Sequence, residues 1–278
     1  MFETRKIEIG APTIIASVQT DPGCVREANE DSGRHISPND PDLQSRRGSL
    51  TVVADGMGGH ASGEVASQMA VDLITELYYA DNGLSASDAL RNAVEIANQE
   101  IFASSQTNED YAGMGTTVIA LVVKDGMAFS AHVGDSRLYR FRNRSLEMLT
   151  LDHSQVMEMV KHGVITMEQA RNHEDKNVIL RAVGTQGAVA VEVSDEFEAR
   201  AGDIFLLCSD GLSDMLEDTE IEGILQKGGD EHSACEALIA AAKANGGHDN
   251  ITVGLIRIAD GMAAAAGSVR ITREIEVG

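Results

Sequence analysis

The chain has 278 residues, of which 43% are hydrophobic and 24% are charged, and this balance argues against wholesale disorder. Its 44 acidic and 22 basic side chains give a formal net charge of −22, so we expect nucleic acid and anionic membrane surfaces to repel it. The composition therefore favours a folded domain that binds neither, and it raises the question of what so many carboxylates do.

The start of the chain and its cysteines exclude several further classes. No apolar run approaches the ~20 residues that span a bilayer, and residues 1–10 are charged and lack the apolar core of a signal peptide. We therefore expect a cytoplasmic protein. Cys24, Cys208 and Cys235 form no C-x-x-C pair, so we predict buried, unreactive thiols without a disulfide or a cysteine zinc site.

The first half of the chain predicts two strands followed by two helices. Strands are expected at residues 14–19 and 50–54, joined by a polar loop that carries two prolines. Apolar residues then recur every four positions from Ser62 to about Tyr79, which predicts a helix with Ser62 as its N-cap. A second helix is predicted to begin near Ser87, and the short turn between the two favours antiparallel packing.

The second half returns to strands, interrupted by two helical stretches. A polar helical stretch is predicted from about residue 153 to 172, and a clear helix is predicted at 231–244. The predicted strands lie at residues 116–123, 127–133, 137–141, 189–197, 204–208 and 251–258. These strands lie too close together for β-α-β units, so we predict one α+β domain over residues 1–260. Residues 261–278 are predicted to form a loose tail or an edge element.

Four aspartates lie within two residues of a predicted strand end. They are Asp55, Asp135, Asp210 and Asp249. In an antiparallel sheet the end of one strand lies beside the start of its neighbour. We therefore expect the four aspartates to gather at one edge of the fold, with Glu30 nearby.

A gathering of carboxylates predicts a bound divalent metal. Without cations such groups repel one another and raise one another's pKa. Oxygen ligands suit Mg²⁺ or Mn²⁺, and no set of His and Cys residues here suits structural zinc. Residues 56–61 also fit the G-x-G-x-x-A pattern of dinucleotide sites, but Asp55 would face the pyrophosphate with like charge. We therefore favour the metal.

Six segments occur in a characteristic order along the chain. They are VREANEDS at 25–32, VADGMGGH at 53–60, GMGTT at 113–117, VGDSR at 133–137, SDGLSD at 209–214 and GHDNIT at 247–252. Together they resemble the bacterial form of the metal-dependent PPM, or type-2C, serine/threonine protein phosphatases. The resemblance implies a four-layer α-β-β-α sandwich, in which two stacked antiparallel sheets are flanked by helix pairs. It also implies a dinuclear Mn²⁺ or Mg²⁺ centre at one end of the sandwich.

The resemblance further implies which residues hold the two metals. Asp55 would bridge both ions. Asp210 and Asp249 would complete the first site, and Glu30 with the backbone carbonyl of Gly56 would serve the second. By the same resemblance, a metal-bridging hydroxide would attack the phosphorus of phosphoserine or phosphothreonine directly, without a covalent phospho-enzyme.

Further roles follow from the same resemblance. Asp135 and Asp214, with Asp210, would hold a weaker third metal. Arg26 would bind the substrate phosphate, and His60 is a candidate general acid. Residues 173–177, HEDKN, depart from the family's His-Pro-x-Arg-Asn in a flap that influences substrate choice, so the resemblance does not carry specificity over.

Two functions remain open at this stage. The first is an active phosphatase whose partners are phosphorylated proteins, such as a Ser/Thr kinase and its substrates, in bacterial signal transduction. The alternative is a catalytically silent PPM-fold module that binds a kinase or a signalling partner. Loss of metal ligands would mark the silent module. The acidic residues of the two main sites are all present, which favours activity.

Overall fold

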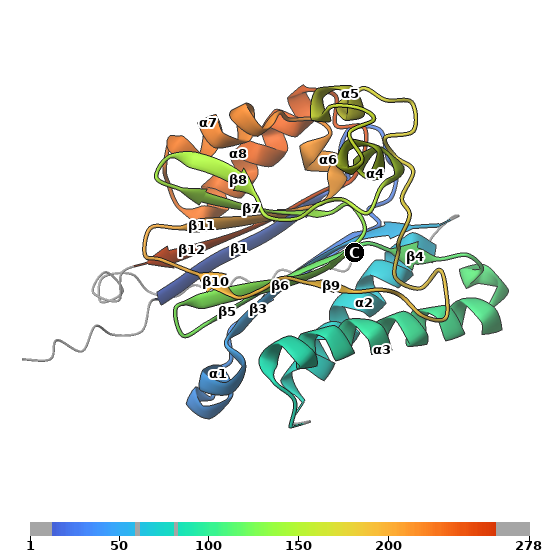
Figure 1. The fold of residues 1–278 in the computed structure, drawn as a ribbon, viewed down its shortest axis with the longest axis horizontal. Coiled ribbons are helices and arrows are strands. Elements are labelled where there is room, and N and C mark those ends of the chain that lie inside the picture. The colour runs from blue at the N-terminus through green and yellow to red at the C-terminus, as the bar shows by residue number, and fades with distance from the viewer. Residues whose placement is uncertain (1–12, 59–61, 81–82, 260–278) are drawn as a thin grey trace, which may run out of the picture.

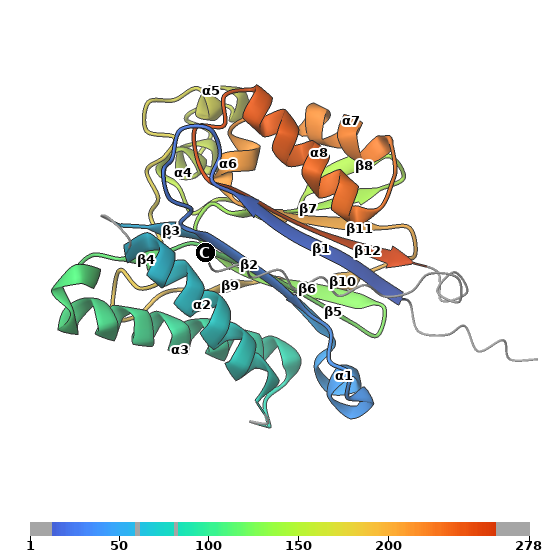
Figure 2. The same cartoon turned by 180° about the vertical axis from the view of Figure 1, so that it is seen from behind.

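The computed structural model describes residues 13–58, 62–80 and 83–259. Within them, two antiparallel sheets lie face to face, and helices cover the outer face of each sheet (Figure 1). The same four layers are seen from behind in Figure 2. The predicted four-layer α-β-β-α sandwich of the α+β class is therefore confirmed. The predicted tail, residues 261–278, lies outside the described residues, and the domain boundary at 260 stays a prediction.

The first sheet has the strand order β1-β12-β11-β7-β8, and every neighbouring pair is antiparallel. Its strands are β1 (Thr13–Asp21), β7 (Arg137–Arg142), β8 (Ser145–Met148), β11 (Ile204–Cys208) and β12 (Ile251–Ala259). Helices α7 (Asp218–Gln226) and α8 (Glu231–Ala244) cover its outer face. All 5 residues of β11 are buried, because this central strand is covered by helices on one face and by the second sheet on the other.

The second sheet has the order β10-β6-β5-β3-β2, with β4 added to β3 and β9 added to β6. Its strands are β2 (Asp31–Ile36), β3 (Ser49–Met57), β4 (Gly115–Thr116), β5 (Val118–Lys124), β6 (Met127–Val133), β9 (Glu192–Val193) and β10 (Phe197–Glu198). Helices α2 (Ser62–Tyr79) and α3 (Ala86–Thr107) cover its outer face and pack against each other. Ser62 is the first residue of α2, so its prediction as the preceding N-cap is wrong.

Side chains alternate between the two faces of each strand, and the buried apolar residues form three cores. One core lies under each helix layer, and the third lies between the two sheets. On β3, Val52 and Ala54 pack beneath α2 and α3, whereas Val53 points to the other sheet. On β11, Phe205 and Leu207 meet Val53 in the core between the sheets. Because successive side chains of a strand point to opposite faces, each central strand contributes to two cores and joins the layers.

Several elements differ from the predictions. The patterns do not predict β2, which lies at a sheet edge and carries polar residues, nor β8 and α7. They also do not predict the short helices α1 (Pro41–Arg47) and α6 (Asp210–Ser213) or the 3-10 turn Glu109–Tyr111. Such pieces are too short to show a period of their own.

Two predicted elements are wrong in extent. The stretch 153–172 is broken into α4 (Gln155–Lys161) and α5 (Met167–Arg171), because Gly163 takes a positive φ of 69° between them. The predicted strand at 189–197 is only two short pairings with β6, made by β9 and β10.

The cysteines agree only in part with the prediction. Cys208 and Cys235 are buried, and burial raises the pKa of each thiol to about 12, which keeps it protonated and unreactive. Cys24 is exposed, so the prediction of burial is wrong for this residue, which lies in the loop after β1. Among the described residues, no helix is both long enough and apolar enough to cross a membrane.

Candidate active site

Acidic side chains contributed by both sheets meet at one end of the sandwich, where β3, β6 and β11 end and β12 begins. We call this group the acidic edge, and its members are Glu30, Asp31, Asp55, Asp135, Asp210, Asp214 and Asp249. The charges of Asp31, Asp135 and Asp210 act on Asp55, and those of Asp214 and Asp249 act on Asp210. The structure thus brings together the carboxylates that their placement at strand ends predicts to be neighbours.

Asp55 is the member of the acidic edge with the most backbone support. It lies opposite Asp31 in the pairing of β3 with β2. Its backbone N–H donates to Thr117 Oγ1 at 3.0 Å, and its carbonyl accepts from Thr116 Oγ1 at 2.9 Å. Burial, together with the charges of Asp31 and its other acidic neighbours, raises the pKa of Asp55 well above its usual value. The strand therefore holds this carboxylate rigidly in a place where its charge needs a cation.

Three more carboxyl groups are buried in surroundings where their negative charge would need a cation. Burial is the main cause that raises the pKa of Asp31 to about 7 and that of Asp210 to about 6, and it also raises the pKa of Asp135 well above its usual value. The Oδ1 atom of each of these three has no hydrogen-bond partner among the described residues. Buried polar atoms are normally paired, and carboxylate oxygens are the ligands that Mg²⁺ and Mn²⁺ prefer. The acidic edge therefore fits hard divalent cations.

The loop that carries Glu30 is fixed by a residue to which the sequence assigned no role. The side chain of Asn250 donates to the carbonyls of Pro22 and Ala28 at 3.1 and 2.9 Å, and its Oδ1 accepts from the backbone N–H of Glu30 at 2.8 Å. Asn250 is buried and adjoins Asp249. The segment GHDNIT contains the only sequence signal for this residue, and one buried amide thereby ties the start of β12 to the loop before β2.

Gly56 allows Glu30 and the start of α2 to approach β3 closely. A Cβ on Gly56 would lie 2.2 Å from the carbonyl oxygen of Gly63 and 2.4 Å from that of Glu30. A Cβ on Gly63 would lie 2.7 Å from the carboxyl carbon of Glu30. Gly56 lies inside β3 and not in a tight turn. Close approach, and not turning, explains why this position is a glycine.

Arg26 lies beside Asp249 on the solvent-exposed side of the acidic edge. Its Nη2 lies 2.8 Å from Asp249 Oδ2, and its side chain is 51% exposed. The hydrogen bond with Asp249 raises the pKa of Arg26, to which the charges of Glu30 and Asp55 add. The guanidinium is thus held next to the carboxylates but remains open to a ligand that arrives from solvent.

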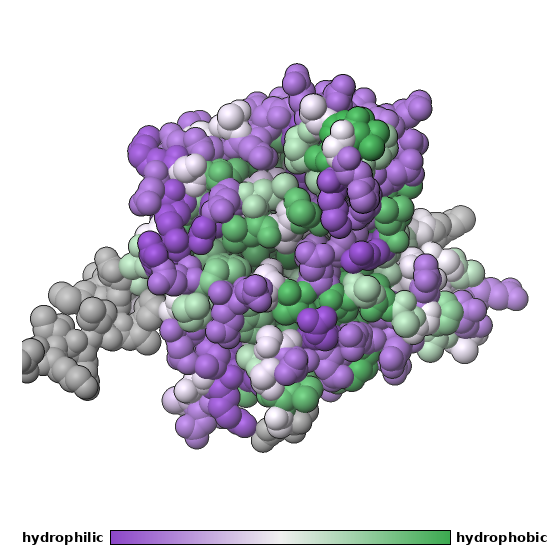
Figure 3. All heavy atoms as spheres, viewed as in Figure 1, coloured by the Kyte–Doolittle hydropathy of each residue, from purple (hydrophilic) through white to green (hydrophobic). Residues whose placement is uncertain are grey.

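The flap, which we define as residues 154–180, closes one side of the site. Lys176 Nζ lies 2.5 Å from Asp214 Oδ2, so a flap residue that departs from the family pattern is paired with the acidic edge. Under the flap lies a cavity of about 500 Å³ that reaches from Asp135 and Asp210 to the apolar side chain of Met157. An apolar patch bordered by hydrophilic residues lies on the flap near α4 and α5 (Figure 3). Val164, between the two helices, and Met167, the first residue of α5, are both exposed.

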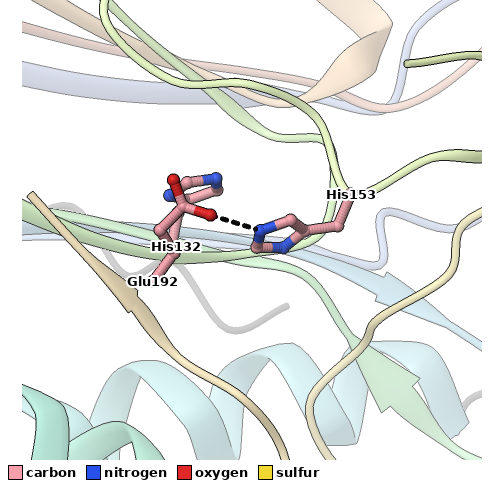
Figure 4. Close-up of side chains that lie close together, drawn as sticks. All are labelled: His132, His153 and Glu192. Atoms are coloured by element: carbon pink, nitrogen blue, oxygen red, sulfur yellow. Dashed lines mark hydrogen bonds and ion pairs between the residues drawn. The ribbon is translucent and has the colours of Figure 1, made fainter. Parts of the chain in front are cut away.

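A second group of possible metal ligands lies beside the site, in which His132, His153 and Glu192 face one another (Figure 4). In the described part of the chain it is the one group of three or more such side chains whose ligating atoms all lie within 4.8 Å of one another. Among the described residues of the acidic edge, no three side chains have ligating atoms that all lie within 4.8 Å of one another. His153 Nδ1 already accepts from Gly134 N at 3.1 Å, and Arg181 lies 3.3 Å from its Nε2. A cation at this histidine would meet a protonated nitrogen and a guanidinium, so we do not assign the metal here.

The remaining predicted residue is His60. It lies outside the described residues, so its proposed role as a general acid stays a prediction.

Comparison with known proteins places the chain among relatives of one kind. Residues 37–236 match the family model described as Protein phosphatase 2C. The chain belongs to the protein phosphatase 2C family. The serine/threonine phosphatase stp of Listeria monocytogenes is 39% identical over 247 residues, which covers 87% of this chain and 94% of that protein. Protein phosphatase PhpP of Streptococcus pneumoniae is 37% identical over 250 residues, which covers 86% and 96%. The family predicted from the six segments is confirmed.

Solved structures agree with this membership. Stp1 from Staphylococcus aureus matches with a TM-score of 0.81 and 35% identity over 92% of this chain and 99% of that chain. The catalytic domain of the phosphatase PstP matches with a TM-score of 0.75 and 35% identity over 89% and 99%, and it was solved in complex with 2 manganese ions. The PstP catalytic domain, which has this fold, thus binds the kind of cation that the acidic edge fits.

Proposed function

We propose that this chain is an active, metal-dependent phosphatase that hydrolyses phosphoserine and phosphothreonine on proteins. The observation that carries the proposal is the acidic edge itself: carboxylates with raised pKa values and unpartnered buried oxygens, beside a guanidinium that is open to solvent. The named relatives are a serine/threonine phosphatase and a protein phosphatase, which supports the same reaction class.

The carboxylates would divide into two metal sites that share Asp55. In this proposal Asp210 and Asp249 complete one site, and Glu30 with the Gly56 carbonyl completes the other. Two ions held in this way would make hydroxide available at neutral pH for direct attack on phosphorus. The protein supplies rigid placement of the carboxylates, so little reorganisation is needed when the phosphate arrives.

A weaker third site is proposed at Asp135, Asp210 and Asp214. The unpartnered Oδ1 of Asp135 supports it. Lys176 already pairs with Asp214, so a cation there would have to share Asp214 with the ammonium group or displace it.

Arg26 would bind the phosphoryl group. Its guanidinium offers a planar, permanently charged fork that suits phosphate oxygens, and its bond to Asp249 is the contact that must loosen as the phosphate binds. We propose direct hydrolysis because Cys208 and Cys235 are buried and protonated, and because the thiol of the exposed Cys24 donates to the Lys243 carbonyl at 3.8 Å. Within the described residues, no G-x-S-x-G segment places a serine as a nucleophile.

The reaction implies its partners. A phosphatase for phosphoserine needs a protein kinase that makes its substrate, so we propose phosphorylated proteins and a Ser/Thr kinase as the partners, with signalling in the bacterial cytoplasm as the setting. The net charge of −22 disfavours nucleic acid as a partner.

The test measures hydrolysis of p-nitrophenyl phosphate and of a phosphothreonine peptide with Mn²⁺, with and without EDTA. We expect turnover that EDTA abolishes, and Asp210→Asn and Asp249→Asn should each lower kcat by about 100-fold or more, as losses of metal ligands do. Asp72→Asn, which changes an exposed carboxylate paired with Arg34, is the matched control and should keep wild-type rates.

The opposite result has a defined meaning. Folded wild-type protein without metal-dependent turnover would favour the silent binding module. Wild-type rates in Asp210→Asn or Asp249→Asn would refute the ligand roles of these residues even if the enzyme is active.

A further inference from the structure

His153 holds the backbone of Gly134 at both of its polar groups. The backbone N–H of His153 donates to the Gly134 carbonyl at 2.8 Å, and the N–H of Gly134 donates to His153 Nδ1 at 3.1 Å. Gly134 has a φ of +107°, and a Cβ there would lie 2.7 Å from the Thr117 side chain. Asp135 follows directly in the chain. The histidine therefore fixes a strained turn that aims Asp135 into the acidic edge.

The same residue anchors the flap. The His153 carbonyl accepts from the backbone N–H of Leu180 at 2.7 Å, and Gln155 N donates to the Val178 carbonyl at 2.9 Å. Ser154 and Ile179 form an isolated β-bridge. Both ends of the flap thus meet at His153, so one residue joins the base of the flap to the turn that carries Asp135.

The surroundings of the ring fix which nitrogen carries the proton. Because Nδ1 accepts from Gly134, the proton of the neutral ring is on Nε2, which lies 3.2 Å from Glu192 Oε2. The ring of His132 stacks on that of His153 at 4.5 Å and 10° (Figure 4), and its Nε2 lies 3.0 Å from the Leu151 carbonyl. Glu192 therefore accepts the Nε2 proton, and the stacked His132 supports the orientation of the ring that keeps Nδ1 available to Gly134. The guanidinium of Arg181, whose Nη1 lies 3.3 Å from the same Nε2, can only donate and so makes no hydrogen bond to the protonated nitrogen.

An ion pair between two half-buried side chains holds the neighbouring part of the same segment. Arg137 Nη2 and Nε lie 2.7 and 2.9 Å from the two carboxylate oxygens of Asp152. This pair brings the residue before His153 next to the start of β7. It does not contact Gly134. On the other side of Asp135, Ser136 Oγ lies 2.7 Å from Thr117 Oγ1, so His153 holds the Gly134 side of the turn and Thr117 holds the Ser136 side.

We propose that His153 is a positioning residue that sets Asp135 and the base of the flap as one unit, with Glu192 holding its ring. The proposal rests on the proposed phosphatase site, because it concerns how Asp135 is presented to a metal. No contact between His153 and the substrate is involved.

The test compares two amide substitutions at His153. Asn places its Oδ1 where Nδ1 stands, so His153→Asn keeps the acceptor for Gly134 and loses the contact with Glu192. His153→Gln places its amide near Nε2, so it keeps the contact with Glu192 and loses the acceptor. The measurements are calorimetric titration of Mn²⁺ into the metal-free protein, free Mn²⁺ by electron paramagnetic resonance, kcat and KM for p-nitrophenyl phosphate, and thermal unfolding.

We expect the two variants to differ in Mn²⁺ affinity and to have similar unfolding temperatures. His153→Gln should weaken the weakest Mn²⁺ site by about 10-fold or more and lower kcat similarly, with KM almost unchanged, since partners that orient a metal ligand typically contribute 10–100-fold. His153→Asn should stay within about 3-fold of wild type on the same scale. Both should unfold at similar temperatures, because each loses one hydrogen bond of the ring.

The outcomes are separable from those of the proposed function. Wild type without Mn²⁺ binding or turnover would count against the phosphatase site. An active wild type with His153→Gln equal to it in Mn²⁺ affinity, or with His153→Asn as impaired as His153→Gln, would overturn the positioning role alone. If His153→Gln does not fold, His153→Asn decides alone: a loss of about 10-fold or more in its Mn²⁺ affinity, although the acceptor for Gly134 is kept, would overturn the role.

Discussion

The neutral side chain of Asn250 fixes the position of the loop that carries the charged residue Glu30. Its amide contacts three backbone groups of the loop before β2. Asn250→Ala should therefore lower the free energy of unfolding by about 1–3 kcal/mol, the cost of leaving buried partners unpaired, and should raise the Mn²⁺ concentration needed for half-maximal rate. Urea unfolding and a Mn²⁺ titration of activity measure the two effects.

The matched control for this substitution is Asn245→Ala. Asn245 is exposed and donates one hydrogen bond to the Met215 carbonyl, so its loss should leave the Mn²⁺ dependence unchanged. An Asn250→Ala protein that keeps both wild-type stability and wild-type Mn²⁺ dependence would show that the loop does not need this amide.

Residues differ in how far the sequence alone predicts their place. Asp55 lies near the end of β3, and Asp135, Asp210 and Asp249 lie within two residues of a strand. That information is local, so their convergence is predictable. Asn250 acts on Glu30, 220 positions away in the chain. No periodicity or motif spacing encodes such a contact, because it exists only once both sheets are assembled.

At the scale of elements, the contact between β3 and α2 depends on a missing methyl group. Gly56→Ala would press a Cβ onto two carbonyl oxygens. We expect the free energy of unfolding to fall by about 1–3 kcal/mol, as overpacking does, and activity to fall with it because Glu30 must move. Chemical denaturation and the rate with p-nitrophenyl phosphate test this.

Gly223→Ala in α7 is the control for the same change. A Cβ there meets nothing within 4 Å, so the helix should gain up to about 1 kcal/mol. If Gly56→Ala behaves like Gly223→Ala, close approach does not explain the glycine.

Elements with a strong period are the ones that the sequence predicts well. Helix α8 and strand β11 have the bounds that the pattern predicts, because each buries one long apolar face or run. The flap is predicted poorly, since α4 and α5 have 7 and 5 residues and take their shape from contacts with His153 and α6. Strand β2 is hidden for a similar reason: its polar residues suit an edge.

At the scale of the whole molecule, the buried carboxylates couple stability to pH and to metal. Burial raises the pKa of Asp210 to about 6 and that of Asp31 to about 7. A raised folded-state pKa favours the protonated group. This contribution to stability is therefore fully present below the unfolded pKa near 4 and is lost as the pH rises through 6 to 7.

The metal-free protein should therefore unfold at a lower temperature at pH 8 than at pH 5, and Mn²⁺ should raise the unfolding temperature most at pH 8, where the carboxylates are ionised. Differential scanning calorimetry in EDTA and in Mn²⁺ measures this. Asp210→Asn should flatten the pH slope in EDTA. A metal-free unfolding temperature that does not fall between pH 5 and pH 8 would contradict the burial of ionisable carboxyls at this end of the fold.

The acidic edge draws Glu30 and Asp55 from one layer, whereas Asp210 and Asp249 flank β11 and β12 of the other. Cations bound by both groups of ligands would crosslink the two sheets. The catalytic rate would then depend on the relative position of the sheets, and a binding partner that displaces one sheet slightly would lower activity without contacting the active site.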